Sequence, residues 1–62
     1  MNLSKRQLES LMATMRAVDS DESSDAMWQA MLENAADVWG IANNVSIDSY
    51  DAFMLYVELN GE

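Results

Sequence analysis

The apolar positions of residues 4–18 recur at intervals of three, four and seven, which places them on one face of an α-helix. They are Leu8, Leu11, Met12, Met15 and Val18. Ser4 followed by Gln7 matches a capping box at the start of this helix. The pattern predicts an amphipathic helix that buries one face and keeps its charged side chains in water.

A second helix is predicted for residues 24–39, where apolar residues cover roughly half of the helical wheel. One edge of this face carries Met27, Met31 and Val38, and the other carries Trp28, Leu32 and Trp39. A face this wide is typical of a helix that packs between two others, with the tryptophans and methionines in the core. Gly40 follows in the position of a left-handed C-cap, so we expect the helix to end there.

The third apolar stretch, residues 49–59, is compatible with a helix or a strand. Asp48 before it and Gly61 after it fit an N-cap and a C-cap. The run FMLYVEL also contains the aromatic and β-branched residues that favour strands. A strand needs a pairing partner, and the short run NNVSI is the sole candidate, so the helix is the favoured prediction.

These three helices predict an all-α fold with a single domain over residues 1–62. The architecture is either a small three-helix bundle or a helical hairpin plus a third helix, completed by dimerisation. A chain this short is marginally stable alone. Because it has no cysteine, it cannot form a disulfide, and helix packing, a hard cation or self-association must stabilise it.

The third helix carries more apolar residues than one packed face needs. A three-helix monomer cannot bury both of its apolar arcs, so we expect Leu55, Tyr56 and Leu59 to form an exposed patch. The alternative is that this second arc packs on the loop of residues 41–47. Aromatic and apolar residues are typical of interface cores, and these three are therefore candidate partner contacts.

The charge of the chain is strongly negative and unevenly distributed. The net charge is −8, the basic residues are Lys5, Arg6 and Arg16, and residues 17–62 contain ten acids and no base. Nucleic acids and anionic membranes both require cationic groups, so we expect neither as a partner. A protein partner with a basic or apolar groove is the complementary choice. The chain has no apolar run of the ~20 residues that span a bilayer and no apolar signal core, which predicts a cytoplasmic protein.

Some acids repeat at the spacing of one helical turn. Glu33 and Asp37 share a helix face, and Glu58 stands in the same relation to Glu62. Two readings are open for these carboxylates. They imitate the phosphates of a nucleic acid and occupy the groove of a partner, or they keep a small protein soluble. Glu33, Asp37 and Glu58 are candidate partner contacts under the first reading.

The acidic run DSDESSD, residues 19–25, begins like a calcium-binding loop. Asp19, Asp21 and Ser23 match ligand positions 1, 3 and 5, but Ser24 stands where Gly is needed and Ala30 where a bidentate Glu is needed. We therefore predict no metal site. The run is better explained as a connector whose acids favour the start of the second helix and whose serines, Ser23 or Ser24, cap it.

Catalysis is not expected from this set of residues. There is no histidine or cysteine, which removes the usual general base and the usual thiol nucleophile. No glycine-rich phosphate loop is present, and 62 residues rarely enclose a catalytic cleft. We expect neither an enzyme nor a cofactor.

No motif of a particular family is present. The chain is very short, acidic, cysteine-free and helical, and in these respects it resembles accessory proteins of phages and mobile elements. Such proteins often bind a host protein. The first hypothesis is a small acidic protein-interaction module that binds its partner stoichiometrically and modulates or inhibits a basic nucleic-acid-handling protein. The alternatives are a homo-oligomeric structural unit such as a homodimer, a nucleic-acid mimic and a cation-responsive switch.

Overall fold

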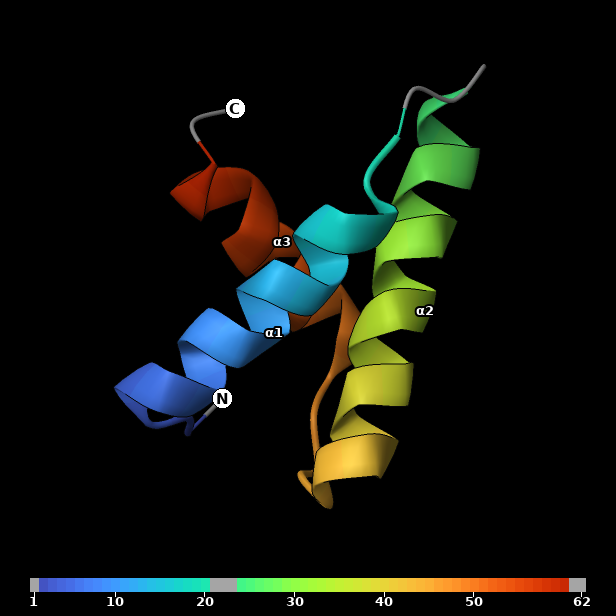
Figure 1. Cartoon of the computed structure of the whole chain (residues 1–62). Helices are drawn as coiled ribbons and strands as arrows, with labels where there is room; N and C mark the ends of the chain where they lie inside the picture. Colours follow the sequence, from blue (N-terminus) through green and yellow to red (C-terminus); the bar gives the residue numbers. More distant parts are fainter. Residues whose placement is uncertain (1, 21–23, 61–62) are drawn as a thin grey trace.

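The computed structural model of the chain describes residues 2–20 and 24–60, which form three α-helices. Helix α1 spans Lys5–Val18, α2 spans Asp25–Asn43 and α3 spans Ser49–Leu59. Helix α2 packs against both other helices, which lie to its left in Figure 1. The radius of gyration is 10.8 Å, close to the roughly 10.6 Å of a compact chain of this length. The prediction of an all-α three-helix fold is confirmed, and the third segment is a helix.

Each helix begins at a side chain that accepts a backbone hydrogen bond. Ser4 Oγ accepts from the backbone N–H of Gln7 at 3.1 Å, and Gln7 Oε1 accepts from the Ser4 N–H at 2.9 Å, which confirms the capping box. Ser24 and Asp48 cap α2 and α3, accepting at 3.2 and 3.1 Å from the N–H groups three residues later. These local bonds satisfy donors that a helix start would otherwise leave unpaired.

The end of α2 differs from the prediction. The helix passes through Gly40 and ends at Asn43, and Asn44 adopts the left-handed conformation with φ 56°. Asn44 N–H donates to Ile41 O at 3.3 Å and Val45 N–H to Gly40 O at 2.8 Å, the pair of bonds of a Schellman motif. Helix α3 ends at Leu59. The Gly61 cap expected for this helix lies outside the described residues.

Gly40 serves packing instead of chain reversal. A Cβ at this position would lie 2.7 Å from Ile47 Cγ2 and 2.9 Å from the carbonyl oxygen of Val45. The missing side chain therefore lets the loop between α2 and α3 cross directly over the helix. This tertiary contact explains why a glycine lies within α2, where its intrinsic propensity is unfavourable.

The core is a single cluster with members from all three helices. Its buried residues are Leu11, Met12 and Met15 of α1, Leu32, Ala35, Ala36 and Trp39 of α2, and Ala52, Phe53 and Tyr56 of α3. Trp28 lies half-buried beside this cluster and meets Phe53 edge-to-face, with ring centroids 5.2 Å apart. Trp39 Nε1 donates to Ser10 Oγ at 2.9 Å, which fixes α2 against α1.

Candidate interaction surface

The patch expected on the third helix is not formed as predicted. Tyr56 is 3% exposed, Leu55 is half-buried against the core, and Leu59 alone of the three is freely exposed. The expectation of an exposed patch is therefore wrong for Tyr56. The residues that α3 buries are Ala52, Phe53 and Tyr56.

Glu33 and Asp37 share a helix but have different surroundings. Glu33 is half-buried and accepts from Gln29 Nε2 at 2.7 Å and from Ser49 Oγ at 3.4 Å, which ties it to the start of α3. Asp37 is exposed and forms no hydrogen bond or ion pair with any residue that the structure describes. Glu58 is exposed as well, and its partner in the predicted pair, Glu62, lies outside the described residues. Asp37 and Glu58 are thus the acids of this group that remain open to a ligand.

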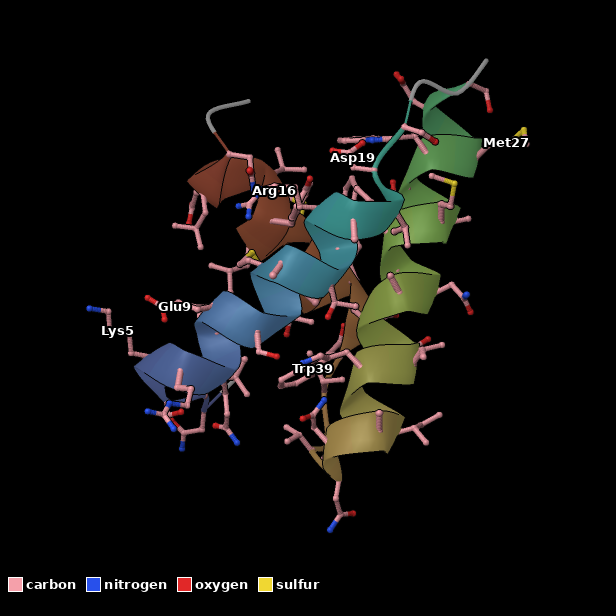
Figure 2. The ribbon with its side chains drawn as sticks, viewed as in Figure 1. Lys5, Glu9, Arg16, Asp19, Met27 and Trp39 are labelled. Carbon is pink, nitrogen blue, oxygen red and sulfur yellow. The ribbon has the colours of Figure 1, made fainter. Side chains whose placement is uncertain are left out.

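Asp19 connects the three helices, a role that the sequence did not reveal. Its backbone N–H caps α1, while its carboxylate accepts from Trp28 Nε1 at 2.8 Å and from the Tyr56 hydroxyl at 2.6 Å. In Figure 2 the labelled Asp19 lies where the chain leaves α1 and approaches the start of α2. The available signal was the polar group that a buried tyrosine and a packed tryptophan each need to satisfy.

The pKa shifts of Asp19 and Tyr56 indicate that this contact has a structural role. The hydrogen bonds from Tyr56 and Trp28 lower the pKa of Asp19 below its ordinary 3.8. Burial, followed by the bond to Asp19, raises the pKa of Tyr56 from 10.0 to about 12. The carboxylate is therefore ionised and occupied by two donors at neutral pH, and the phenol keeps its proton.

A hollow of about 440 Å³ opens beside Asp19. Arg16, Trp28, Tyr56, Val57 and Asn60 form the rest of its wall. Arg16 Nη2 donates to Asn60 Oδ1 at 3.3 Å, so the guanidinium links the last turn of α1 to the C-cap of α3. The polar groups of this hollow are thus largely used in contacts between the helices.

The acidic run of residues 19–25 falls partly outside the described residues. Asp21 and Ser23, two of its three matching positions, lie in that undescribed segment. The third, Asp19, turns its carboxylate toward Trp28 and Tyr56. Among residues 2–20 and 24–60, no group of three or more histidine, cysteine, aspartate or glutamate side chains is arranged to hold a metal ion.

The structure exposes an apolar surface along α2, although the sequence placed the methionines of this helix in the core and Ile41 in the following loop. Met27 and Val38 are each 56% exposed and Ile41 is 83% exposed, with half-buried Met31 on the same side of the helix. Their spacing of four, seven and three residues places them on one face. We call these four residues the α2 ridge. The core uses the opposite edge of the predicted wide face, because α1 and α3 both pack on that edge.

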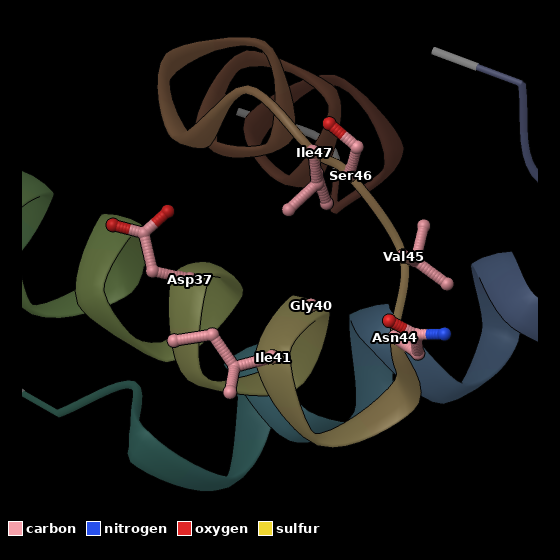
Figure 3. Close-up of a pocket in the computed structure, with 7 residues that line it drawn as sticks. All are labelled: Asp37, Gly40, Ile41, Asn44, Val45, Ser46 and Ile47. Carbon is pink, nitrogen blue, oxygen red and sulfur yellow. The ribbon is translucent and has the colours of Figure 1, made fainter.

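A groove adjoins the C-terminal end of the α2 ridge. It has a volume of about 730 Å³ and lies between the last turns of α2 and the loop that leads to α3. Its lining residues are Asp37, Gly40, Ile41, Asn44, Val45, Ser46 and Ile47. In Figure 3 Asp37 and Ile41 lie on the helix side and Val45, Ser46 and Ile47 on the loop side. We call this feature the Asp37 groove.

No family model, curated protein or solved structure matches the chain. None of the described helices is long and apolar enough to cross a membrane.

Proposed function

We propose that this chain is a non-enzymatic protein-interaction module that binds a basic partner protein stoichiometrically. The partner that best fits its charge is a nucleic-acid-handling protein, whose activity the module modulates or inhibits. The observation that carries the proposal is the α2 ridge, a set of exposed and half-buried apolar side chains that share one helix face with the exposed Asn34, on a helix that has acidic residues and no basic ones. Apolar residues exposed on one face are typical of a surface that another molecule covers.

The charge distribution supports a basic partner. Lys5, Arg6 and Arg16 all belong to α1, so α2 and α3 present acids without a cation of their own. An acidic surface steers a basic protein toward it and speeds the encounter, while the apolar contacts hold the complex together. The ridge also replaces the third helix as the main candidate surface. Helix α3 exposes Tyr50, Met54 and Leu59, but Leu59 lies on a different face of the helix from the other two, whereas the residues of the ridge share one face.

The proposal is tested by affinity capture from an extract of the source organism at low salt, followed by elution at high salt and mass spectrometry. We expect a basic protein in stoichiometric amount, because screening weakens an electrostatically steered complex. The purified partner is then titrated calorimetrically at both salt concentrations. The proposal fails if no protein is retained stoichiometrically, or if the retained partner is acidic and binds independently of salt.

Self-association is the second candidate, and the α2 ridge favours it too, since two copies can cover each other's ridge. The salt dependence separates the two candidates. Each copy carries a net charge of −8, so screening strengthens a homodimer and weakens a complex with a basic partner. Light scattering across a salt series decides between them. A dimer that tightens as salt rises, with no basic protein captured, supports the homo-oligomeric unit.

Nucleic-acid mimicry has less support than either of these. The Glu33 carboxylate, half of the phosphate-like pair, is used by Gln29 and Ser49 within the fold. A mimic needs carboxylates that face outward together, and only Asp37 of this pair is free to do so among the described contacts.

A further inference from the structure

We infer that the Asp37 groove receives one arginine or lysine side chain from a partner helix that packs along the α2 ridge. This inference rests on the proposed function and names the chemistry of the partner at a specific place. Exposed apolar ridges of helices are recognised by amphipathic helices. The Asp37 groove adds a charged end to such a ridge, and that end selects the kind of residue the partner must supply.

The walls of the groove suit a long basic side chain. Ile41 and half-buried Ile47 provide apolar surface on opposite sides, one from α2 and one from the loop. Arginine and lysine bury an aliphatic stem along such surface while the charged head reaches a polar group. Gly40 forms the floor of the groove, where Ile47 and the carbonyl oxygen of Val45 pack directly against the helix.

The polar groups of the groove are available to a ligand. Asp37, Asn44 and Ser46 are exposed, and none of their side chains bonds to another residue in the part of the chain that the structure describes. The Asp37 carboxylate supplies the counter-charge for a guanidinium or ammonium group. The amide oxygen of Asn44 and the hydroxyl oxygen of Ser46 can accept hydrogen bonds from the remaining N–H donors of arginine. Arginine fits this set best, because its planar group donates in several directions.

The length of the ridge defines the partner element. Met27 and Ile41 lie about 21 Å apart along the helix axis, which a partner helix of about four turns covers. Such a helix places apolar residues on Met27, Met31 and Val38 and its basic residue beside Ile41, over the Asp37 groove. A second copy of α2 could cover the ridge but would leave the Asp37 groove without a counter-charge. It lacks a basic residue and would set Asp37 against further acids.

The test uses nuclear magnetic resonance of the full chain labelled with nitrogen-15. The probe is a synthetic amphipathic peptide of leucine and arginine at helical spacing, with one version that has lysine and one that has the uncharged isostere citrulline in place of arginine. We expect amide shifts to concentrate at residues 37–47 and along the α2 ridge. The arginine peptide should bind tightest and the citrulline peptide weakest.

Variants identify the contacting residues. Asp37→Asn should weaken binding of the arginine peptide by about five- to tenfold, the range for an ion pair that is partly shielded from water. Glu9→Gln is the matched control, because it removes one charge from an exposed acid of α1 that has no bond to the described residues. It should weaken binding by less than about twofold. Ile41→Ser should weaken all three peptides alike, because it removes apolar contact and no charge.

Three outcomes overturn the inference in different ways. If the shifts gather on α3 and Leu59→Ser weakens binding while Asp37→Asn matches Glu9→Gln, the partner surface lies on the third helix and the proposed function survives. If citrulline binds as well as arginine, the groove does not recognise charge. If no peptide binds at low salt, the groove is not such a site, and the capture experiment alone then decides the proposed function.

Discussion

The hydroxyl of Tyr56 donates a 2.6 Å hydrogen bond to the carboxylate of Asp19, a residue 37 positions earlier in the chain. Tyr56 lies in the buried part of α3, and Asp19 caps the end of α1. The same carboxylate accepts from Trp28 of α2, so one exposed acid ties all three helices together. In a domain of this size such a contact is a large share of the tertiary polar bonding.

Replacing Tyr56 with phenylalanine isolates this hydrogen bond. Tyr56→Phe keeps the buried ring and removes the hydroxyl, and we expect it to lower the free energy of unfolding by about 0.5–1.5 kcal/mol. Tyr50→Phe is the control, because Tyr50 is exposed and its hydroxyl bonds to no described residue. Urea titration followed by far-ultraviolet circular dichroism measures both. Equal losses in the two variants would show that the bond to Asp19 adds nothing.

The lowered pKa of Asp19 predicts how stability responds to acid. Its folded-state pKa lies below the ordinary 3.8, so the stabilisation is present above that value and is lost as the pH falls through the folded-state pKa. Asp19→Asn removes this titration. The difference in unfolding free energy between the two proteins should be largest near neutral pH and shrink below about pH 4. A difference that stays constant down to the lowest pH would contradict the assignment.

The raised pKa of Tyr56 predicts the opposite dependence in alkali. Its folded-state value of about 12 exceeds the ordinary 10.0, so the stabilisation is present below pH 10 and is lost as the pH rises toward 12. Tyr50→Phe leaves Tyr56 as the one tyrosine of the chain, and phenolate absorbance then reports it alone. We expect a midpoint near 12 while circular dichroism shows intact helices. Ionisation near pH 10 in a folded protein would exclude the bond to Asp19.

A substitution at Gly40 sets the gain in helix propensity against the loss of packing with the loop. Gly40→Ala favours the helix by up to ~1 kcal/mol, but its Cβ would lie 2.9 Å from the carbonyl oxygen of Val45, a backbone atom that cannot rotate away. We expect a net loss of about 1–3 kcal/mol in unfolding free energy. Asn34→Ala, at an exposed site in the same helix, is the control and should be neutral or slightly stabilising. A stabilised Gly40→Ala would mean that the loop does not press on α2.

The helices themselves were predictable because their signals are local. Ser4 with Gln7, and Asp48 before the third segment, bond to residues three positions away, which a linear pattern can reveal. The end of α2 was not predictable in this way. Gly40 carries the residue type of a C-cap, yet Asn44 takes the left-handed conformation, because Ile47 must approach the helix at Gly40. That requirement depends on where the loop packs, which the pattern of apolar residues along the chain does not show.

The candidate surface depended even more on tertiary structure. The sequence shows that α2 has a wide apolar face, but the packing of α1 and α3 decides which edge of it stays exposed. Because both neighbours lie toward Leu32 and Trp39, Val38 and Ile41 remain in water. Tyr56 was wrongly predicted to be exposed, because the sequence does not show which side of the third helix packs against its neighbours. Its hydroxyl has a partner in Asp19 that lies far away in the sequence.

The exposure of the α2 ridge makes a prediction that needs no partner. If Ile41 lies in water, Ile41→Ser should change the unfolding free energy by no more than about 0.5 kcal/mol. Leu32→Ala, at a fully buried site on the same helix, should lose about 2–5 kcal/mol. That loss is a large part of the roughly 3–9 kcal/mol expected for a domain of this length.

Urea titration compares the unfolding free energies of the Ile41→Ser and Leu32→Ala variants. A loss at Ile41 as large as that at Leu32 would show that the ridge is already covered within the folded chain or by a second copy. Repeating the titration at several protein concentrations separates these cases, because only a dimer gains stability as concentration rises.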